Sequence, residues 1–400
     1  MRKFVSIILA LTLSAFAFSA GFQLNEHSST YAAMGNAVVA NARNASAIFY
    51  NPAGLTYLPG LNVSFNVSLV YPESHWESLD GSLRTDQKKH LNVLPAVYVT
   101  KQLNDRVTVG IGEFSQYGLQ TDWPAGWPGT ELADRTYIRT FYISPTVAFK
   151  LTDNFSIGIQ ANYVLSDVLI TNQINFIDQF ADVELSGDGD GWGGSFGFEW
   201  DVTDKFHIGG VFRSEVTIHY DGDADFDNVP TPFLPILYDG NIKAKVTLPQ
   251  TWAIGFSYQY SKNLEIAAEW FHTDWSSYDK LEAVRTNGEV LKSVPKLWDN
   301  VDSYRIGIAY KWNDSFTFKF GYIYDENPAP DETVEPTLPD SDRNDYSVGM
   351  DWHFSKNLTI SSYFMWVHFN DRRVVGNQSG FDGVYQTEAY LLGFGLDYRF

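Results

Sequence analysis

Alternation of large apolar residues with small or polar ones is the feature that most restricts how this chain can fold. In the final segment, LLGFGLDYRF, the even positions from Leu392 to Phe400 are large and apolar, and the odd positions are Gly, Asp and Arg. A period of two residues is typical of β-strands whose two faces differ chemically. The chain is therefore expected to be all-β. The same pattern recurs in LNVSFNVSLVY, NFSIGIQANY, TWAIGFSYQY, SYRIGIAYKW and FTFKFGYIY.

A soluble sandwich would also alternate, with its apolar face turned inward. Three features favour instead a transmembrane antiparallel barrel with its apolar face toward lipid. Aromatic residues gather at the strand ends, and the opposite face is small and polar enough for a wet or plugged lumen. The chain also ends in a strand at Phe400, as outer-membrane barrels commonly do.

Short and long connections alternate along the chain, which predicts the number of strands. Six short connections are rich in Asn, Asp, Ser and Lys, and seven long polar connections lie between the strand pairs. Thirteen connections join fourteen strands, and an even number places both termini on one side. The short connections are 102–106, 151–155, 202–206, 260–264, 312–316 and 354–358, and the long ones lie near 72–90, 115–137, 169–192, 221–241, 276–300, 326–343 and 370–387. The expected strands are 61–71, 91–101, 106–114, 138–150, 155–168, 194–201, 205–220, 242–260, 263–275, 301–312, 315–325, 344–354, 357–369 and 388–400.

Residues 1–19 have the organisation of a secretory signal peptide. A basic start precedes an apolar run over residues 4–16, and small residues follow. Cleavage is expected between Ser19 and Ala20. An uncleaved anchor is the alternative, but the apolar run is too short to favour it.

Composition excludes several classes of function. The net charge of −20 argues against a nucleic-acid partner. The absence of cysteine excludes disulfides, thiolate catalysis and cysteine-based zinc sites. The acidic stretches SGDGDG (186–191) and DGDADFDN (221–228) lack the Gly and Glu positions of a calcium-binding EF-hand. They are interpreted as solvated external loops, with weak divalent binding left open, and neither a metal site nor a cofactor is expected.

An outer-membrane hydrolase is the main enzymatic alternative, and it would need a Ser and a His on neighbouring strands. The eight His residues are dispersed, with His272 and His368 the only candidates near strand ends. Nothing in the sequence singles out a nucleophile, so no catalytic residue is expected.

Residues 20–60 have no strand pattern and include the almost uncharged stretch NARNASAIFYNPAGLTYLPG. A barrel of fourteen strands has a lumen too wide for its own side chains to fill. A small, nearly uncharged segment could fill it without burying an unpaired charge. Residues 20–60 are therefore expected to form a plug inside a barrel of residues 61–400. A disordered periplasmic leader is the alternative.

Seven motifs occur in order along nearly the whole mature chain: AGFQLNEHSS, NPAG, YGLQTDWPAGW, FRSEV, DWSSYDKL, DSYRIGIAY and LPDSDR. Together they resemble the FadL family of outer-membrane transporters for long-chain fatty acids and other hydrophobic compounds. The resemblance implies a fourteen-stranded barrel with an N-terminal hatch, in which Asn51, Pro52 and Ala53 form the hatch motif. It also implies that the N-terminus reaches a ligand site in the lumen and gates it through Ala20, Gly21, Phe22, Gln23 and Leu24.

In that family, ligand passes from an external groove to an internal site and leaves sideways through a gap made by a kinked third strand. The corresponding strand here contains VGIGEF, and Gly110 and Gly112 are candidates for the kink. The alternative is that both glycines simply belong to the small inward face.

Strand parity places Arg213, Arg305 and Lys319 on the lumen face, where a cation could bind a fatty-acid carboxylate. The alternative is that each pairs with an internal acid such as Glu215 or Asp302. Because no cluster of cations is visible, a neutral aromatic or alkane hydrocarbon remains open as the substrate.

The sequence and the resemblance together predict a monomeric transporter of hydrophobic small molecules, fatty acids first. It would lie in the outer membrane of a Gram-negative bacterium, in contact with lipid and lipopolysaccharide, with no cofactor. A general diffusion porin is the alternative function, and it would need an open lumen.

Overall fold

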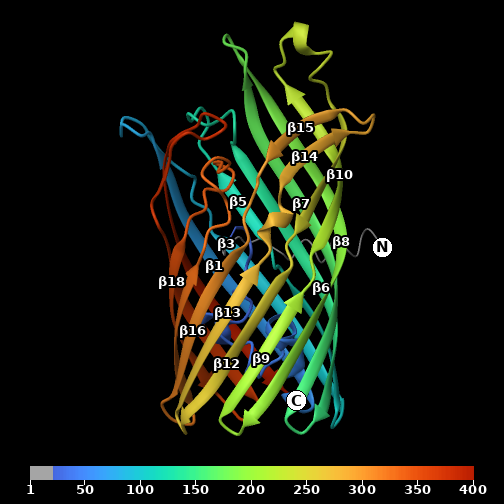
Figure 1. The fold of residues 1–400 in the computed structure, drawn as a ribbon, viewed down its shortest axis with the longest axis vertical. Coiled ribbons are helices and arrows are strands. Elements are labelled where there is room, and N and C mark those ends of the chain that lie inside the picture. Colours follow the sequence, from blue (N-terminus) through green and yellow to red (C-terminus); the bar gives the residue numbers. More distant parts are fainter. Residues whose placement is uncertain (1–20) are drawn as a thin grey trace.

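The computed structural model describes residues 21–400, in which strands form a closed antiparallel barrel (Figure 1). The first and last strands close it, in a register from Asn62 opposite Arg399 to Glu77 opposite Val384. The predicted count of fourteen strands is confirmed. The fourteen are β1 (Leu61–Glu77), β3 (Asn92–Asn104), β4 (Val107–Phe114), β6 (Arg135–Thr152), β7 (Phe155–Asn175), β8 (Phe180–Thr203), β9 (Phe206–Arg213), β12 (Thr251–Ser261), β13 (Leu264–Thr273), β16 (Val301–Lys311), β17 (Phe316–Asp325), β18 (Arg343–His353), β19 (Leu358–Phe369) and β21 (Gly383–Arg399).

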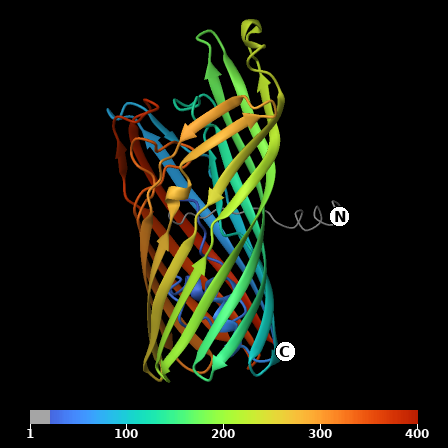
Figure 2. The same ribbon diagram turned by 45° about the vertical axis from the view of Figure 1, so that its right-hand side comes forward.

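Seven further strands extend the wall at the end of the barrel that carries the long loops, called here the loop end. Two of them, β14 and β15, form a hairpin that projects from the wall there (Figures 1 and 2). The seven are β2 (Arg84–Asp86), β5 (Gly118–Asp122), β10 (Val216–Asp227), β11 (Gly240–Leu248), β14 (Lys280–Arg285), β15 (Val290–Pro295) and β20 (Arg372–Val374).

The prediction of long connections is wrong for several segments, and residues 169–192 show the reason. Strands β7 and β8 stay paired to the end of the hairpin, where Asn175 lies opposite Phe180. In this part of β8, Val183 and Leu185 are buried, whereas Asp182 and Glu184 face outward. Where a strand extends beyond the lipid, its outer face meets water and can hold acidic residues, while its inner face stays apolar. The resulting sequence is rich in acidic residues and therefore resembles that of a loop. The same holds for β10 and for the β14–β15 hairpin.

The lipid-facing surface has the predicted polarity. The outward residues of β21 are large and apolar, with Leu392 43%, Phe394 47% and Leu396 42% exposed. The short turns lie at the same end as the C-terminus (Figure 1), which in this class of barrel faces the periplasm.

Within residues 21–400, helical structure is confined to five short pieces. No helix within residues 21–400 is long and apolar enough to cross a membrane. The predicted signal peptide, residues 1–19, lies outside the described residues. The helices are α2 (Ser29–Ala32), α3 (Ala47–Tyr50), η1 (Pro52–Tyr57), η2 (Thr231–Phe233) and η3 (Trp275–Ser277).

Residues 25–60 lie inside the turn-end half of the barrel (Figures 1 and 2), with α2 against β18 and β19, and η1 against β6 and β7. Lumen-facing glycines let this segment approach the wall closely. A Cβ atom on Gly158 would lie 2.3 Å from the backbone of Pro52, and one on Gly197 would lie 2.1 Å from the Asn51 side chain. The small inward face predicted from the sequence therefore makes room for the N-terminal segment.

Candidate ligand-binding site

The three lumen cations named from strand parity are buried, but each already has a partner. Arg305 Nη1 lies 3.0 Å from Glu269 Oε1, and Lys319 Nζ lies 2.5 Å from Asp351 Oδ2. Arg213 donates to the main-chain carbonyl of Phe49 and stacks on its ring, 5.0 Å from the centroid. Parity thus located the cations on the correct face, while the acids considered from the sequence, Glu215 and Asp302, are not their partners.

These ion pairs also hold the N-terminal segment. Glu269 Oε2 accepts hydrogen bonds from the main-chain N–H groups of Val38 and Val39, at 3.1 and 3.0 Å. Asp351 accepts from the Thr30 hydroxyl at 2.6 Å. The wall cations are therefore part of a polar contact between wall and segment, and none of the three lines the apolar cavity described below.

Asn51 connects three parts of the chain. Its side-chain oxygen caps η1 by accepting from Ala53 N at 3.1 Å. Its Nδ2 donates to the carbonyls of Val39, at 2.6 Å, and Phe198, at 2.9 Å. Pro52 begins η1, a position where its missing N–H costs nothing.

Residues 21–24, called here the gating segment, lie along the wall at an interruption. Leu24 N donates to the carbonyl of Gln116 at 2.8 Å, and Gly118 N donates to the carbonyl of Phe22 at 2.9 Å. The first residue predicted for this segment, Ala20, lies outside the described residues.

The wall is interrupted at Ser115–Tyr117, and not at the two glycines named as kink candidates. Strand β4 runs through Gly110 and Gly112 in unbroken register with β3 and β6. A Cβ on either glycine would lie 2.9 Å from Ile48, so both belong to the small inward face. After the interruption β5 pairs with β6 alone among the described strands. The stretch SQY contains neither Gly nor Pro, so sequence patterning could not find it.

An apolar cavity of about 270 Å³ lies at the loop end, next to the gating segment. A smaller one of about 50 Å³ shares part of its lining. Sites for small molecules usually measure about 300–1,000 Å³, so the two together suit one modest ligand. Most of the lining is aliphatic and includes Leu119, Ile138, Val168, Ile170, Val183, Leu185, Val246, Leu281 and Leu291.

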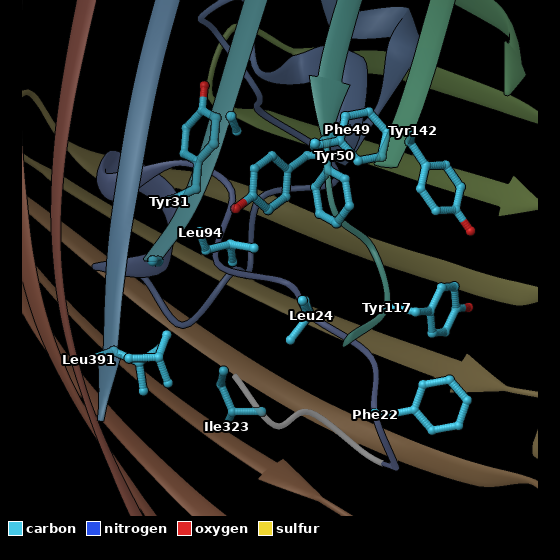
Figure 3. Packing of buried hydrophobic residues seen from close by; sticks show 14 of the residues in the cluster. Phe22, Leu24, Tyr31, Phe49, Tyr50, Leu94, Tyr117, Tyr142, Ile323 and Leu391 are labelled. Carbon is cyan, nitrogen blue, oxygen red and sulfur yellow. The ribbon is translucent and has the colours of Figure 1, made fainter. Parts of the chain in front are cut away.

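Phe22 forms one border of the cavity and belongs to an aromatic cluster. Its ring centroid lies 4.8 Å from that of Trp275, 5.6 Å from Tyr278 and 5.9 Å from Trp298. In the close view of Figure 3, Phe22 lies next to Tyr117 and farther from Phe49 and Tyr50 of α3. The gating segment is therefore both hydrogen-bonded to the wall and packed beneath the cavity.

Two lysines of the β14–β15 hairpin and its exit line the cavity, and the sequence analysis missed both. Lys296 Nζ lies 2.6 Å from Glu335 Oε2. Lys292 donates to Asn172 Oδ1 at 3.2 Å and forms no ion pair within residues 21–400. Burial lowers the pKa of the Lys292 ammonium, and Glu335 only partly offsets this effect. The spacing of two lysines in LKSVPKLW was the available signal, but it lay in a connection interpreted as solvated.

The two histidines considered as catalytic candidates contact carboxylates, and residues 21–400 contain no metal-binding group of side chains. No three His, Asp or Glu side chains within residues 21–400 lie close enough to hold a metal ion. His272 lies between Asp274 and Asp302, at 2.8 and 2.6 Å, and His368 lies 3.5 Å from Glu388. Both candidate histidines thus contact carboxylates.

Comparison with known proteins agrees with this architecture. A family model described as outer membrane protein transport protein (OMPP1/FadL/TodX) matches residues 10–400. The long-chain fatty acid transport protein of Escherichia coli K12 is 25% identical, covering 100% of this chain and 98% of that protein. The 47 kDa outer membrane protein of Pasteurella multocida is 26% identical, covering 100% and 99%.

Solved structures share the fold at lower identity. A Pseudomonas aeruginosa FadL homologue has a TM-score of 0.87 and 19% identity, covering 95% of this chain and 100% of that one. The P. putida toluene transporter TodX has a TM-score of 0.77 and 17% identity, covering 94% and 98%.

Proposed function

This chain belongs to the FadL family and serves outer-membrane transport of hydrophobic compounds in a Gram-negative bacterium, and within that function we propose that its substrates are long-chain fatty acids. Members of the family are transporters and not enzymes.

One observation carries the choice of fatty acid. The aliphatic cavity contains Lys292, an ammonium without an ion-pair partner among the described residues. A carboxylate placed there would form charge-assisted hydrogen bonds, which are about twice as strong as neutral ones. A neutral hydrocarbon would fill the apolar space but leave the charge of Lys292 buried without compensation. A neutral hydrocarbon is the second candidate substrate, favoured by the aliphatic side chains that make up most of the lining.

The proposed route begins at the outer tips of the barrel. Ile177, Leu234 and Ile236 are 96%, 50% and 61% exposed there, where they could capture a hydrophobic solute. The solute then enters the cavity above Phe22. A shift of the gating segment opens the interruption at Ser115–Tyr117, and the ligand leaves sideways toward lipid. This route suits an apolar molecule because it avoids a water-filled pore.

We assign the role of a plug to residues 25–60. They fill the lumen between the cavity and the periplasmic end, and their contacts with the wall combine ion pairs with backbone hydrogen bonds. Such contacts support a segment that stays seated while only residues 21–24 move.

The test of substrate class is binding of labelled oleate and of a labelled neutral aromatic hydrocarbon to the detergent-solubilised protein, each competed against the other. Saturable oleate binding that the hydrocarbon displaces poorly supports fatty-acid transport. Preference for the hydrocarbon would contradict the proposal. Binding of neither, with steady ion conductance in a planar bilayer, would indicate a diffusion porin.

The test of the gating role is removal of residues 20–24. Insertion into the outer membrane should be unaffected, because these residues contribute no strand to the barrel. Oleate uptake should fall, and unchanged uptake would contradict the gating role.

A further inference from the structure

We propose that the carboxylate of Glu335 occupies the place that a fatty-acid head group takes on Lys296, and that the ligand frees the gating segment by displacing Glu335. This inference rests on the proposed function, because it requires an anionic ligand.

The ion pair joins two separate loops at the cavity wall. Lys296 follows β15, and Glu335 lies in the loop between β17 and β18. Their side chains are only 7% and 16% exposed, and both line the cavity together with Lys292. Burial acts to lower the pKa of Lys296, but the charge and hydrogen bond of Glu335 together with Tyr278 hold that pKa above its ordinary value. The pair is therefore charged and largely shielded from water.

The loop of Lys296 holds the gating segment from one side. Trp298, two residues further on, packs against Phe22 with ring centroids 5.9 Å apart. Gly21 adopts φ +66°, and a Cβ atom on it would lie 2.6 Å from Trp298. The first residues of the gating segment thus fit closely under this loop.

The loop of Glu335 holds the same residues from the other side. Asp340 Oδ2 accepts a hydrogen bond from Gly21 N at 2.8 Å. Arg372 anchors this part of the loop by donating to the main-chain carbonyl of Asp340 at 2.6 Å. The two loops therefore form a clamp around the start of the gating segment, with Trp298 on one loop and Asp340 on the other. The Lys296–Glu335 pair is its charged contact, beside hydrogen bonds from the Thr333 hydroxyl to the Lys296 carbonyl and from Asp299 N to the Pro328 carbonyl.

An anionic ligand can open this clamp at little electrostatic cost. Removing Glu335 alone would leave the buried charge of Lys296 uncompensated, which is strongly unfavourable. A fatty-acid carboxylate would take the place of the Glu335 carboxylate on Lys296, so Lys296 keeps an anionic partner. The same carboxylate can also pair with Lys292, which Glu335 does not contact. Because a ligand shifts an equilibrium only by its preference for one state, a neutral ligand in the same cavity has no such effect on the clamp.

The first experiment measures oleate and methyl oleate binding to Glu335→Gln. Glutamine keeps the shape of the side chain but removes the charge that competes with the ligand, so oleate should bind about tenfold more tightly. This factor corresponds to about one protein in ten having Lys296 free for the ligand before the change. Methyl oleate should bind as it does to the unaltered protein. The matched control is Glu332→Gln, since Glu332 lies in the same loop as Glu335 but is exposed and does not line the cavity. Oleate affinity should be unchanged in this control.

The second experiment follows the gating segment directly. The chain has no cysteine, so Gln23→Cys introduces a single thiol at a position that is 1% exposed. Its rate of labelling by a polar maleimide should rise with oleate but not with methyl oleate. Adding Glu335→Gln should raise the rate without any ligand. Heat-modifiable migration on gels confirms that each variant is folded.

The outcomes separate this inference from the proposed function. If the protein binds oleate and Lys292→Met abolishes that binding, but Glu335→Gln changes neither affinity nor labelling, the clamp is wrong and fatty-acid transport stands. If the unaltered protein does not bind oleate, the proposed function fails and the clamp fails with it.

Discussion

The two halves of the lumen contain the same kinds of charged groups in opposite situations. In the turn-end half, Arg305 and Lys319 each have an acid from a neighbouring strand, and those acids also bind the N-terminal segment. In the loop-end half, Lys292 has no ion pair among the described residues and faces an aliphatic cavity. A buried cation by itself therefore does not mark a ligand site. What marks it is an unpaired charge with apolar space beside it.

The largest expected effect concerns the turn-end half. Arg305→Ala leaves Glu269 buried without its cation, and it should lower the free energy of unfolding by about 3–5 kcal/mol. The measurement is equilibrium unfolding by urea in detergent micelles. The folded fraction should bind oleate as before, since Arg305 does not line the cavity.

The matched control for that change is the double variant Arg305→Met with Glu269→Gln. It removes both charges but keeps an acceptor oxygen for the amides of Val38 and Val39, so most of the lost stability should return. If Arg305→Ala lowers oleate affinity as well as stability, the turn-end half also contributes to ligand binding, and the distinction between the two halves is wrong.

The second prediction addresses the loop-end half. Lys292→Met removes the unpaired charge but keeps the length of the side chain. Oleate affinity should fall about ten- to a hundredfold, as expected for a hydrogen bond to a charged group. The free energy of unfolding without ligand should not fall, because the change removes a buried charge that has no ion-pair partner among the described residues. Isothermal titration and urea unfolding of the same sample give both values.

Lys280→Met provides the control for Lys292→Met. Lys280 lies on the same hairpin and pairs with Glu282, but its side chain is 54% exposed and lines neither of the two cavities. Oleate should bind this variant unchanged. Equal losses in both lysine variants would mean that net charge, and not the position of Lys292, governs binding.

The third prediction concerns the border between the halves. Gly21→Ala places a methyl group against Trp298 and Trp275 at a left-handed φ, which should destabilise the seated gating segment by about 1–3 kcal/mol. Planar-bilayer recordings should show more frequent channel openings. The control Gly126→Ala has a similar φ of +72° but open space around it, and it should leave conductance unchanged.

The smallest expected effect is a pH dependence at Asp340. Burial raises the pKa of this carboxyl to about 6, although Arg343 and the amide of Gly21 act in the opposite direction. A carboxyl with a raised pKa takes up a proton on folding, so its contribution is present at low pH and is lost as the pH rises through about 6. Lowering the pH from 7 to 5 should therefore stabilise the protein, relative to Asp340→Asn, by about 1 kcal/mol.

Urea unfolding of both proteins at the two pH values measures that difference. Gly126→Ala and its parent provide a further comparison, since this change alters no titratable group and both proteins retain Asp340, so they should show the same pH increment. If the difference in unfolding free energy between the unaltered protein and Asp340→Asn is the same at both pH values, burial does not raise the pKa of Asp340 as assigned.

The sequence alone determined the barrel, its strand number and the face on which each residue lies. Lipid on one side and a lumen on the other impose a period of two, and Gly110, Arg213 and Arg305 all lie on the predicted face. Turn chemistry determined the strand count because tight turns require particular residues. The face of a residue and the position of a tight turn both depend on residues that are adjacent in the sequence, so they can be predicted without the tertiary structure.

Only the tertiary structure decided the partners of the lumen cations, the place where the wall is interrupted, and the lysines that line the cavity. Glu269 and Arg305 lie on strands that meet only in the barrel, and Lys296 meets Glu335 across two loops. Parity assigns a side chain to a face, but its height along the barrel and its neighbours depend on strand register and on how the loops pack. That is why the alternation predicted the fold correctly, while the site emerged only from the assembled molecule.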